Sequence, residues 1–190
     1  AAIAQGRGAR IHANEPQEHR LDLVAASVEP WEDAVALRLG DGRELGAQEP
    51  EAYDRVLVDA PCSGLGALRR RPEARWRKDP TDIPGLAKLQ RQLLASAFKA
   101  LRPGGALVYS TCSPVLAETR DVVRDFLAAH GRAKLLDAGE VANRVAIRDV
   151  SARDGMVQLW ADTDRTDGMF IALITKEAAD AEAAADSTTS

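Results

Sequence analysis

Residues 56–66, VLVDAPCSGLG, constrain the fold more than any other stretch of the chain. The stretch begins with an apolar, β-branched run, which predicts a strand that is buried on both faces, as strands in parallel sheets are. The strand should end at Asp59, because Pro61 has no N–H group to donate to a neighbouring strand. Asp59 and Cys62 are therefore expected at the carboxyl end of a parallel strand, where open α/β sheets bind ligands.

A second stretch has the same layout. Residues 106–113, ALVYSTCS, form an apolar run that ends in Cys112, and Cys62 and Cys112 are the only cysteines of the chain. Each cysteine lies just past the end of an expected strand. The two could form a disulfide, but nothing resembles a disulfide-rich secreted scaffold, so we expect reduced thiols and a cytoplasmic protein.

Strands alternate with helices along most of the chain, which predicts right-handed βαβ units and an α/β fold with a mostly parallel sheet. The expected strands are 9–13, 35–39, 56–59 and 106–110, and the expected helices are 1–5, 16–28, 86–101 and a helix capped by Ser113 and Pro114. Residues 155–160 and 168–175 are expected to close the sheet as an antiparallel pair. We assign residues 1–176 to the C-terminal part of a catalytic domain and residues 177–190, rich in Ala, Glu, Asp, Ser and Thr, to a disordered tail.

Composition limits the possible partners. The chain has 190 residues, 45% of them hydrophobic, and a net charge of −4, so it has no overall basic surface for nucleic acid. A local patch is available at residues 69–78, where five arginines and a lysine surround Trp76. This loop could contact RNA phosphates and stack on a base, although a solvated charged loop explains the sequence equally well. No apolar run is long enough to predict a membrane span.

Carboxylates follow three of the expected strands, at Glu15, Asp41 and Asp59. In Rossmann-type sites an acidic residue at a strand end accepts hydrogen bonds from ribose hydroxyls. Any one of the three is explained as well by a turn or a helix cap. Three in succession favour a nucleoside cofactor.

The sequence gives little support for a metal site or a thiol hydrolase built on the two cysteines. Two cysteines and three scattered histidines show no metal-ligand spacing, so we expect no metal. A thiol hydrolase needs a histidine base, and none of the histidines falls at an expected strand end.

The motifs DAPCSG at residues 59–64 and STCS at residues 110–113 together resemble the RNA cytosine-5 methyltransferases that use S-adenosylmethionine. The bacterial type that modifies 16S ribosomal RNA is the nearest match. The resemblance covers nearly the whole chain and includes Glu15, the GDG at 40–42, Trp76, the RPGG at 102–105, the ETR at 118–120 and the DGMFIA at 167–172. It implies a Rossmann-like methyltransferase fold whose terminal strand is antiparallel.

The resemblance also implies roles for individual residues. Cys112 would be the nucleophile that adds to carbon 6 of cytosine, and Cys62 would assist product release. Asp59 would contact the cytosine or the cofactor. The residues implied in cofactor binding are Glu15 at the ribose, Asp41 at the adenine, Asp59 and Pro61. One ambiguity is open, because DNA cytosine-5 methyltransferases use a Pro-Cys at the position of Cys62 as the nucleophile.

One part of the family pattern is missing. The family has a glycine-rich loop after its first strand, and no such motif occurs in this sequence, because the Gly6 and Gly8 pair follows a helix. We therefore expect a monomeric fragment that lacks the central first strand and exposes a pairing edge on each side of the gap. The expected substrate is ribosomal RNA. The alternatives are another nucleic acid such as tRNA, or a non-catalytic RNA-binding fragment.

Overall fold

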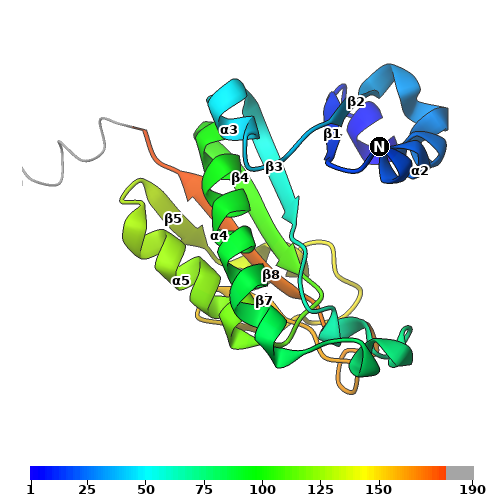
Figure 1. Ribbon diagram of the computed structural model, residues 1–190. Coiled ribbons are helices and arrows are strands. Elements are labelled where there is room, and N and C mark those ends of the chain that lie inside the picture. The colour runs from blue at the N-terminus through cyan, green and yellow to red at the C-terminus, as the bar shows by residue number, and fades with distance from the viewer. Residues whose placement is uncertain (179–190) are drawn as a thin grey trace, which may run out of the picture.

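The computed structural model describes residues 1–178 (Figure 1), and the predicted tail lies outside the described residues from position 179 onward. The strands are β1 (Ile11–Glu15), β2 (Val35–Leu39), β3 (Tyr53–Asp59), β4 (Leu101–Thr111), β5 (Ala133–Leu136), β6 (Ala152–Arg153), β7 (Met156–Gln158) and β8 (Phe170–Lys176). The α-helices are α1 (Ala2–Gln5), α2 (Glu18–Val28), α3 (Leu45–Gln48), α4 (Ile83–Ala100), α5 (Arg120–Ala129) and α6 (Ala138–Asn143). Among the described residues, no helix is both long and apolar enough to cross a bilayer.

The strands form two sheets. β1 pairs with β2 in parallel, and a second sheet has the order β3-β4-β8-β7-β6, with β5 also paired to β8. β3 and β4 are parallel, whereas β8 is antiparallel to β4, β5 and β7. The α/β class and the antiparallel C-terminal pair predicted from the sequence are confirmed.

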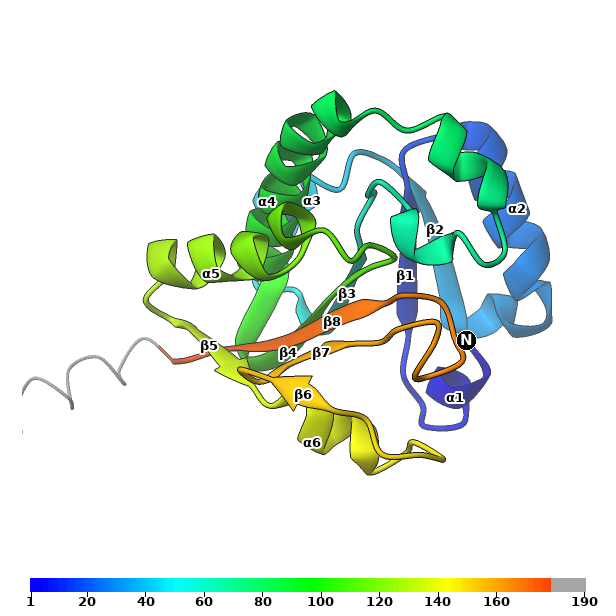
Figure 2. The ribbon, with the colours of Figure 1, turned by 90° about the horizontal axis from the view of Figure 1, so that it is seen from below.

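The larger sheet is covered by helices on both faces. In Figure 2, α4 and α5 lie on one face and α6 lies on the other. Helix α4 buries Leu94 and Phe98, which are four residues apart and so share one side of the helix. They pack in one core with Tyr109 of β4 and Phe126 of α5, and the rings of Phe98 and Phe126 meet edge to face at 5.2 Å.

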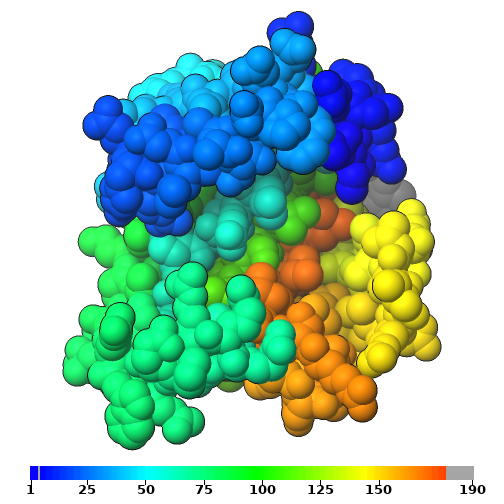
Figure 3. Space-filling model, turned by 90° about the vertical axis from the view of Figure 1, so that its right-hand side faces the viewer, coloured from blue at the N-terminus to red at the C-terminus, as the bar shows by residue number. Residues whose placement is uncertain are grey.

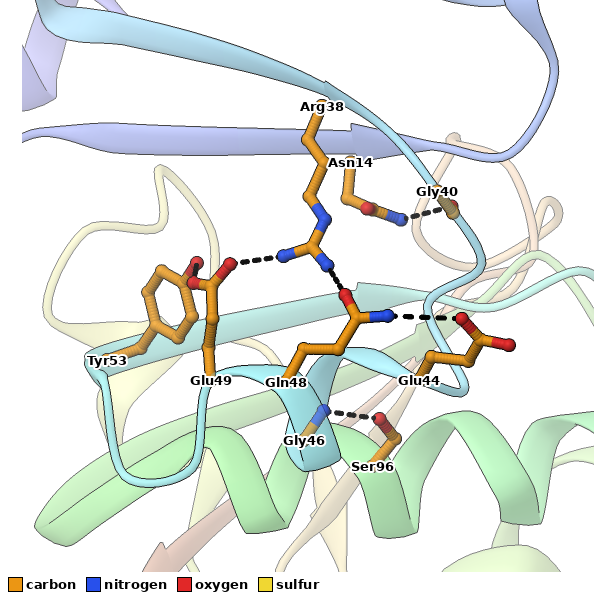
Figure 4. A network of polar contacts seen from close by, with 9 residues as sticks. All are labelled: Asn14, Arg38, Gly40, Glu44, Gly46, Gln48, Glu49, Tyr53 and Ser96. Atoms are coloured by element: carbon orange, nitrogen blue, oxygen red, sulfur yellow. Dashed lines mark hydrogen bonds and ion pairs between the residues drawn. The ribbon is translucent and has the colours of Figure 1, made fainter.

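Polar side chains join the smaller sheet to the larger one (Figure 4). Arg38 of β2 donates to Gln48 and Glu49, at the end of α3. Glu49 also accepts a hydrogen bond from the hydroxyl of Tyr53, the first residue of β3. The contact between β2 and the larger sheet is therefore built from side chains and involves no shared strand pairing.

Close packing of α3 on α4 completes this connection. The N–H of Gly46 donates to the hydroxyl of Ser96 at 2.9 Å. A Cβ atom at Gly46 would lie 2.2 Å from the carbonyl oxygen of Ser96, so this approach requires glycine.

The two sheets leave unpaired edges between them. In the described part of the chain, β1 pairs only with β2, and β3 pairs only with β4. Leu57 of β3 is 68% exposed, although it lies in the most apolar stretch of the strand. The pairing edges expected from the sequence are therefore present.

Some predicted boundaries were wrong. Residues 102–105 were expected to separate the helix at 86–101 from the strand at 106–110, but they lie inside β4, which starts at Leu101. No α-helix starts at Ser113: its hydroxyl accepts the N–H of Val115 at 3.1 Å and donates to Glu118, only a short 3₁₀ helix at Leu116–Glu118 follows, and helix α5 begins at Arg120. The helix expected from residue 86 starts earlier, at Ile83, where Asp79 and Asp82 form a capping box one turn upstream.

Candidate active site

The two cysteine loops meet at one edge of the larger sheet. β3 and β4 are parallel neighbours, and Asp59 is in register with Ser110, so the residues that follow each strand emerge side by side. The sulfur atoms of Cys62 and Cys112 lie 3.3 Å apart, and both thiols are free and half-buried. The expectation that both cysteines lie at strand ends is confirmed.

The two thiols are not equivalent. The hydrogen bond between Cys62 and Cys112 lowers the pKa of Cys112 to about 7, against the opposing effects of its burial and of nearby Asp59. The same hydrogen bond, followed by burial, raises the pKa of Cys62. Cys112 is therefore the more acidic thiol of the pair and starts to ionise near neutral pH, while Cys62 keeps its proton.

A buried carboxyl group lies behind the cysteines. Glu118 accepts hydrogen bonds from the N–H of Ser63 at 2.7 Å and from the hydroxyls of Ser63 and Ser113, each at 2.6 Å. Glu118 was expected only as part of a family motif, with no predicted role of its own. The repeated Cys-Ser pair, at 62–63 and 112–113, is the one sequence signal that could have indicated a shared partner.

Helix α4 contributes a buried amide to the same region. The side-chain N–H of Gln90 donates to the carbonyl oxygen of Pro61 at 2.8 Å and approaches Glu118 at 3.4 Å. The hydroxyl of Tyr109 donates to the backbone carbonyl of Glu118 at 2.7 Å. The Cys62 loop is thus bound to a helix of the core as well as to the other cysteine loop.

Two glycines bring a third segment against Cys112. The N–H of Gly66 donates to the carbonyl oxygen of Cys112 at 2.9 Å, and the N–H of Gly168 donates to the carbonyl oxygen of Gly66 at 2.8 Å. A Cβ atom on Gly66 would lie 1.9 Å from the carbonyl oxygen of Gly168. Only glycine at position 66 permits this stack of three backbones.

The arginine-rich loop extends from this point. Arg70 donates to the buried carboxylate of Asp167 at 2.5 Å, which fixes the start of the loop next to β8. Farther along, Trp76 is 84% exposed, with the guanidinium of Arg75 5.8 Å from its ring centre. Figure 3 shows that the surface is hollowed between this loop and the N-terminal sheet.

Comparison with known proteins identifies the family. The sequence profile described as 16S rRNA methyltransferase RsmB/F matches residues 1–175. The chain belongs to this family. The resemblance seen in the cysteine motifs to RNA cytosine-5 methyltransferases of the bacterial ribosomal type is therefore confirmed.

Individual relatives support the assignment. A Mycobacterium tuberculosis protein that is named as a methyltransferase is 48% identical over 169 residues, which cover 87% of this chain and 35% of that protein. Ribosomal RNA small subunit methyltransferase F of Klebsiella pneumoniae is 37% identical over 180 residues, 94% of this chain and 37% of the relative. The chain thus spans little more than a third of the length of these relatives.

A solved structure agrees with the fold. NSun6 of Pyrococcus horikoshii, crystallised with SFG, an analogue of S-adenosylmethionine, matches with a TM-score of 0.73 and 28% identity. The match covers 88% of this chain and 41% of that one. Members of the RsmB/F family and their structural neighbours depend on S-adenosylmethionine.

The smaller sheet carries groups that suit the nucleoside part of this cofactor. Glu15 ends β1 with a largely buried side chain, which accepts the N–H of Gln17 at 3.1 Å. The adjacent Asn14 has a buried side-chain oxygen without a hydrogen-bond partner among the described residues. Adjacent side chains of a strand point to opposite faces, so the acceptor offered to a ribose diol, with its two O–H donors, is Glu15 and not Asn14. Glu15 therefore fits the ribose of the RsmB/F cofactor.

Asp41 presents another acceptor after β2. Its carboxylate is held by Arg43, and the side-chain hydrogen bond from Arg43 lowers the pKa of Asp41. Asp41 and Arg43 also line a cavity of about 450 Å³, together with Gln92 and Ser96 of α4. Asp41 is thus available to an exocyclic amine only if it shares or exchanges its contact with Arg43. Within residues 1–178, no three His, Cys, Asp or Glu side chains gather as metal ligands would.

Proposed function

We propose that this chain is the catalytic part of an enzyme that methylates carbon 5 of cytosine in RNA, with 16S ribosomal RNA as its substrate. The observation that carries the proposal is the pair of thiols 3.3 Å apart, one of them with its pKa lowered to about 7, at the ligand-binding edge of a methyltransferase fold. Membership of the RsmB/F family supports the substrate.

The chemistry requires a nucleophile that can later leave. Carbon 5 of cytosine reacts poorly with electrophiles until the ring is activated. In the proposed reaction the thiolate of Cys112 forms a bond to carbon 6, which makes carbon 5 nucleophilic. S-Adenosylmethionine, when bound, supplies the electrophilic methyl group. The target base must be unpaired or flipped out of its helix to reach Cys112.

Cys62 fits the second half of the reaction. Its pKa is raised by the hydrogen bond to Cys112 and by burial, and then by the charge of Cys112. Formation of the bond to carbon 6 removes that charge, so the pKa of Cys62 falls at this stage. Cys62 then releases its own proton to solvent and, as the thiolate, accepts the proton that leaves carbon 5, directly or through water. The electrons of the carbon 5–hydrogen bond form the carbon 5–carbon 6 double bond, and Cys112 leaves carbon 6 as the thiolate. Asp59 contacts the cytosine or the cofactor.

The other proposed roles concern the cofactor. Glu15 holds the ribose, Asp41 holds the adenine end, and Pro61 belongs to the wall of the cofactor site. These carboxylates accept hydrogen bonds and take no part in proton transfer.

We also propose that the working enzyme is longer than this chain. The support is the one-third coverage of the relatives and the unpaired edges of β1 and β3, between which a further strand would complete one sheet. Residues 1–190 alone should bind the cofactor weakly and show no turnover. Measurable turnover by this piece would contradict that expectation.

The decisive experiment traps the covalent step. The full-length enzyme is incubated with S-adenosylmethionine and unmodified 16S ribosomal RNA, with tRNA in a parallel reaction, and examined on denaturing gels. A protein–RNA adduct should accumulate in Cys62→Ala and be absent in Cys112→Ala.

Other results would change the proposal. The reverse adduct pattern would make Cys62 the nucleophile, as in the DNA enzymes. Adducts with tRNA alone would change the substrate. RNA binding without any adduct or methyl transfer would favour a non-catalytic RNA-binding protein.

A further inference from the structure

We propose that Glu118 is a positioning residue, which holds Cys62 and Cys112 in contact by binding the serine that follows each of them. The inference rests on the proposed function for its role in methylation, but the geometry that it predicts can be measured without RNA or cofactor.

The carboxyl group of Glu118 connects the two loops that carry Ser63 and Ser113. One oxygen of Glu118 accepts both serine hydroxyls, and its other oxygen accepts the N–H of Ser63. The two hydroxyl oxygens are themselves 3.2 Å apart. Since each serine is bonded directly to a cysteine in the chain, the distance between the loops at the serines limits the distance between the sulfur atoms.

The carboxyl group of Glu118 is itself held in place by its surroundings. Glu118, Ser63 and Ser113 are all buried. The hydroxyl of Tyr109, in β4, holds the backbone of Glu118, and Gln90 of α4 lies against its side chain. The carboxyl group thus acts as a rigid reference between β4, α4 and the two loops.

An apolar side chain of similar size at position 118 could stabilise the fold as well as the Glu118 carboxyl group does. A buried polar group costs free energy unless it is hydrogen-bonded, and buried ionic groups often stabilise no better than apolar ones of similar size. Stability alone therefore gives little reason for a carboxyl group between two serines. Alignment does, because only a group with two acceptor atoms can bind the hydroxyls and the N–H at once.

Loss of the alignment should change the chemistry of Cys112. The hydrogen bond with Cys62 is the largest effect that lowers the pKa of this thiol, its own backbone N–H lowers it further, and burial, Asp59 and Asp167 raise it. Arg70 is also near, but it is paired with Asp167. If Cys62 moves away, the remaining influences favour the neutral thiol of Cys112.

Two thiol measurements on the purified full-length enzyme test this. The first is the rate of Cys112 alkylation by iodoacetamide as a function of pH, read by mass spectrometry. The second is the rate at which oxidised glutathione joins the two cysteines. In that reaction the Cys112 thiolate attacks the reagent and releases one glutathione, and Cys62 loses its proton and displaces the second.

The variants are Glu118→Ala, Glu118→Gln, Ser63→Ala and Ser113→Ala. The matched control is Ser96→Ala, which removes another buried hydroxyl that accepts a backbone N–H, at the contact between α3 and α4. Circular dichroism and thermal melting identify a temperature at which every variant is folded. The two serine variants keep the test usable if Glu118→Ala does not fold.

In Glu118→Ala, the pH midpoint of alkylation should rise above that of the wild type, and disulfide closure should slow by about tenfold, as expected for reacting groups displaced by less than 1 Å. Glu118→Gln, which keeps the shape and one acceptor oxygen, should lie in between. The serine variants should shift in the same direction, and Ser96→Ala should not.

An unchanged pH midpoint and closure rate in folded Glu118→Ala, or in both serine variants, would overturn the proposal. Equal changes in Ser96→Ala would also overturn it, because they would show a general loss of stability. If the thiol effects appear but the enzyme methylates no RNA, the proposed function fails and the positioning role stands.

Discussion

The sulfur atoms of Cys62 and Cys112 share a hydrogen bond at 3.3 Å, which lowers the pKa of Cys112, so one thiol is activated by the other rather than by a histidine. The histidines of the described chain lie elsewhere. The ring of His12 in β1 contacts the ring of Tyr53 in β3, where the two sheets meet. The ring of His130 stacks on Phe126 of α5. Reactivity at this site therefore depends on the geometry of two side chains.

Alkylation of Cys112 should follow this geometry. Because its pKa is lowered to about 7, the thiolate fraction should rise as the pH increases through about 7 and then level off. In Cys62→Ala the hydrogen bond is lost, so the midpoint should move to higher pH. Iodoacetamide kinetics between pH 5 and 10 check this, and a midpoint that is unchanged in Cys62→Ala would contradict it.

Gly66→Ala should destabilise the fold by about 3 kcal/mol, near the upper end of the usual cost of overpacking, because the new methyl group meets backbone atoms. The Cβ would lie 1.9 Å from the carbonyl oxygen of Gly168. The control is Gly85→Ala, where a Cβ meets nothing within 4 Å and helix α4 should gain about 0.5–1 kcal/mol. Urea denaturation measures both, and equal free energies of unfolding for Gly66→Ala and wild type would rule out the tight contact.

The ion pair between Asp167 and Arg70 should make stability depend on pH in the acid range. The hydrogen bond from Arg70 lowers the pKa of Asp167 below its ordinary 3.8. The stability contributed by this group is therefore complete above pH 3.8 and is lost as the pH falls through the lower, folded-state value.

Asp167→Asn removes that dependence, so wild type should be more stable than the variant at pH 7 and the difference should shrink below pH 3.8. The control is Asp54→Asn, at an exposed ion pair with Arg102. Urea midpoints measured from pH 7 to pH 2.5 give both differences. A constant difference for Asp167→Asn across this range would show that the ion pair is not its cause.

Trp76→Ala should weaken RNA binding by about 1–3 kcal/mol, the usual range for one base stacked on an aromatic ring. The free energy of unfolding should hardly change, because the side chain is 84% exposed. Trp76→Phe should restore most of the binding. Fluorescence anisotropy with labelled ribosomal RNA provides the affinities, and Trp160→Ala is the control. Unchanged affinity in Trp76→Ala would remove this side chain from the RNA surface.

Local patterns were enough to locate the strands that lead to the site. The alternation of Val35, Leu37 and Leu39 before Gly40 predicted β2 with its observed bounds, Val35–Leu39. The apolar runs ending near Asp59 and Thr111 predicted where each cysteine would emerge. These predictions succeed because successive side chains of a strand point to opposite faces, so the pattern of apolar residues can be read within the strand's own sequence.

Contacts between distant segments could not be predicted in this way. Ser113 has the residue type of a helix cap and its hydroxyl accepts the N–H of Val115, but the same hydroxyl also binds a carboxyl group five residues later, and only a short 3₁₀ helix follows. Whether Glu118 reaches Ser63 depends on the pairing of β3 with β4, which no local pattern contains. The short elements β5, β6, α3 and α6 were also missed, because their segments are too short to show a clear period.

The polar contacts drawn in Figure 4 form the seam between the two sheets. Because one of them is an ion pair, the strength of this seam should depend on the salt concentration. Glu15 and Asp41 lie on one side of it, with the smaller sheet, and the two cysteines lie on the other. The side chains that cross it from Arg38 include a charged pair with Glu49, and mobile ions weaken such pairs where they are open to solvent. Ionic strength should therefore set how firmly the carboxylates are held opposite the thiols, before any ligand arrives.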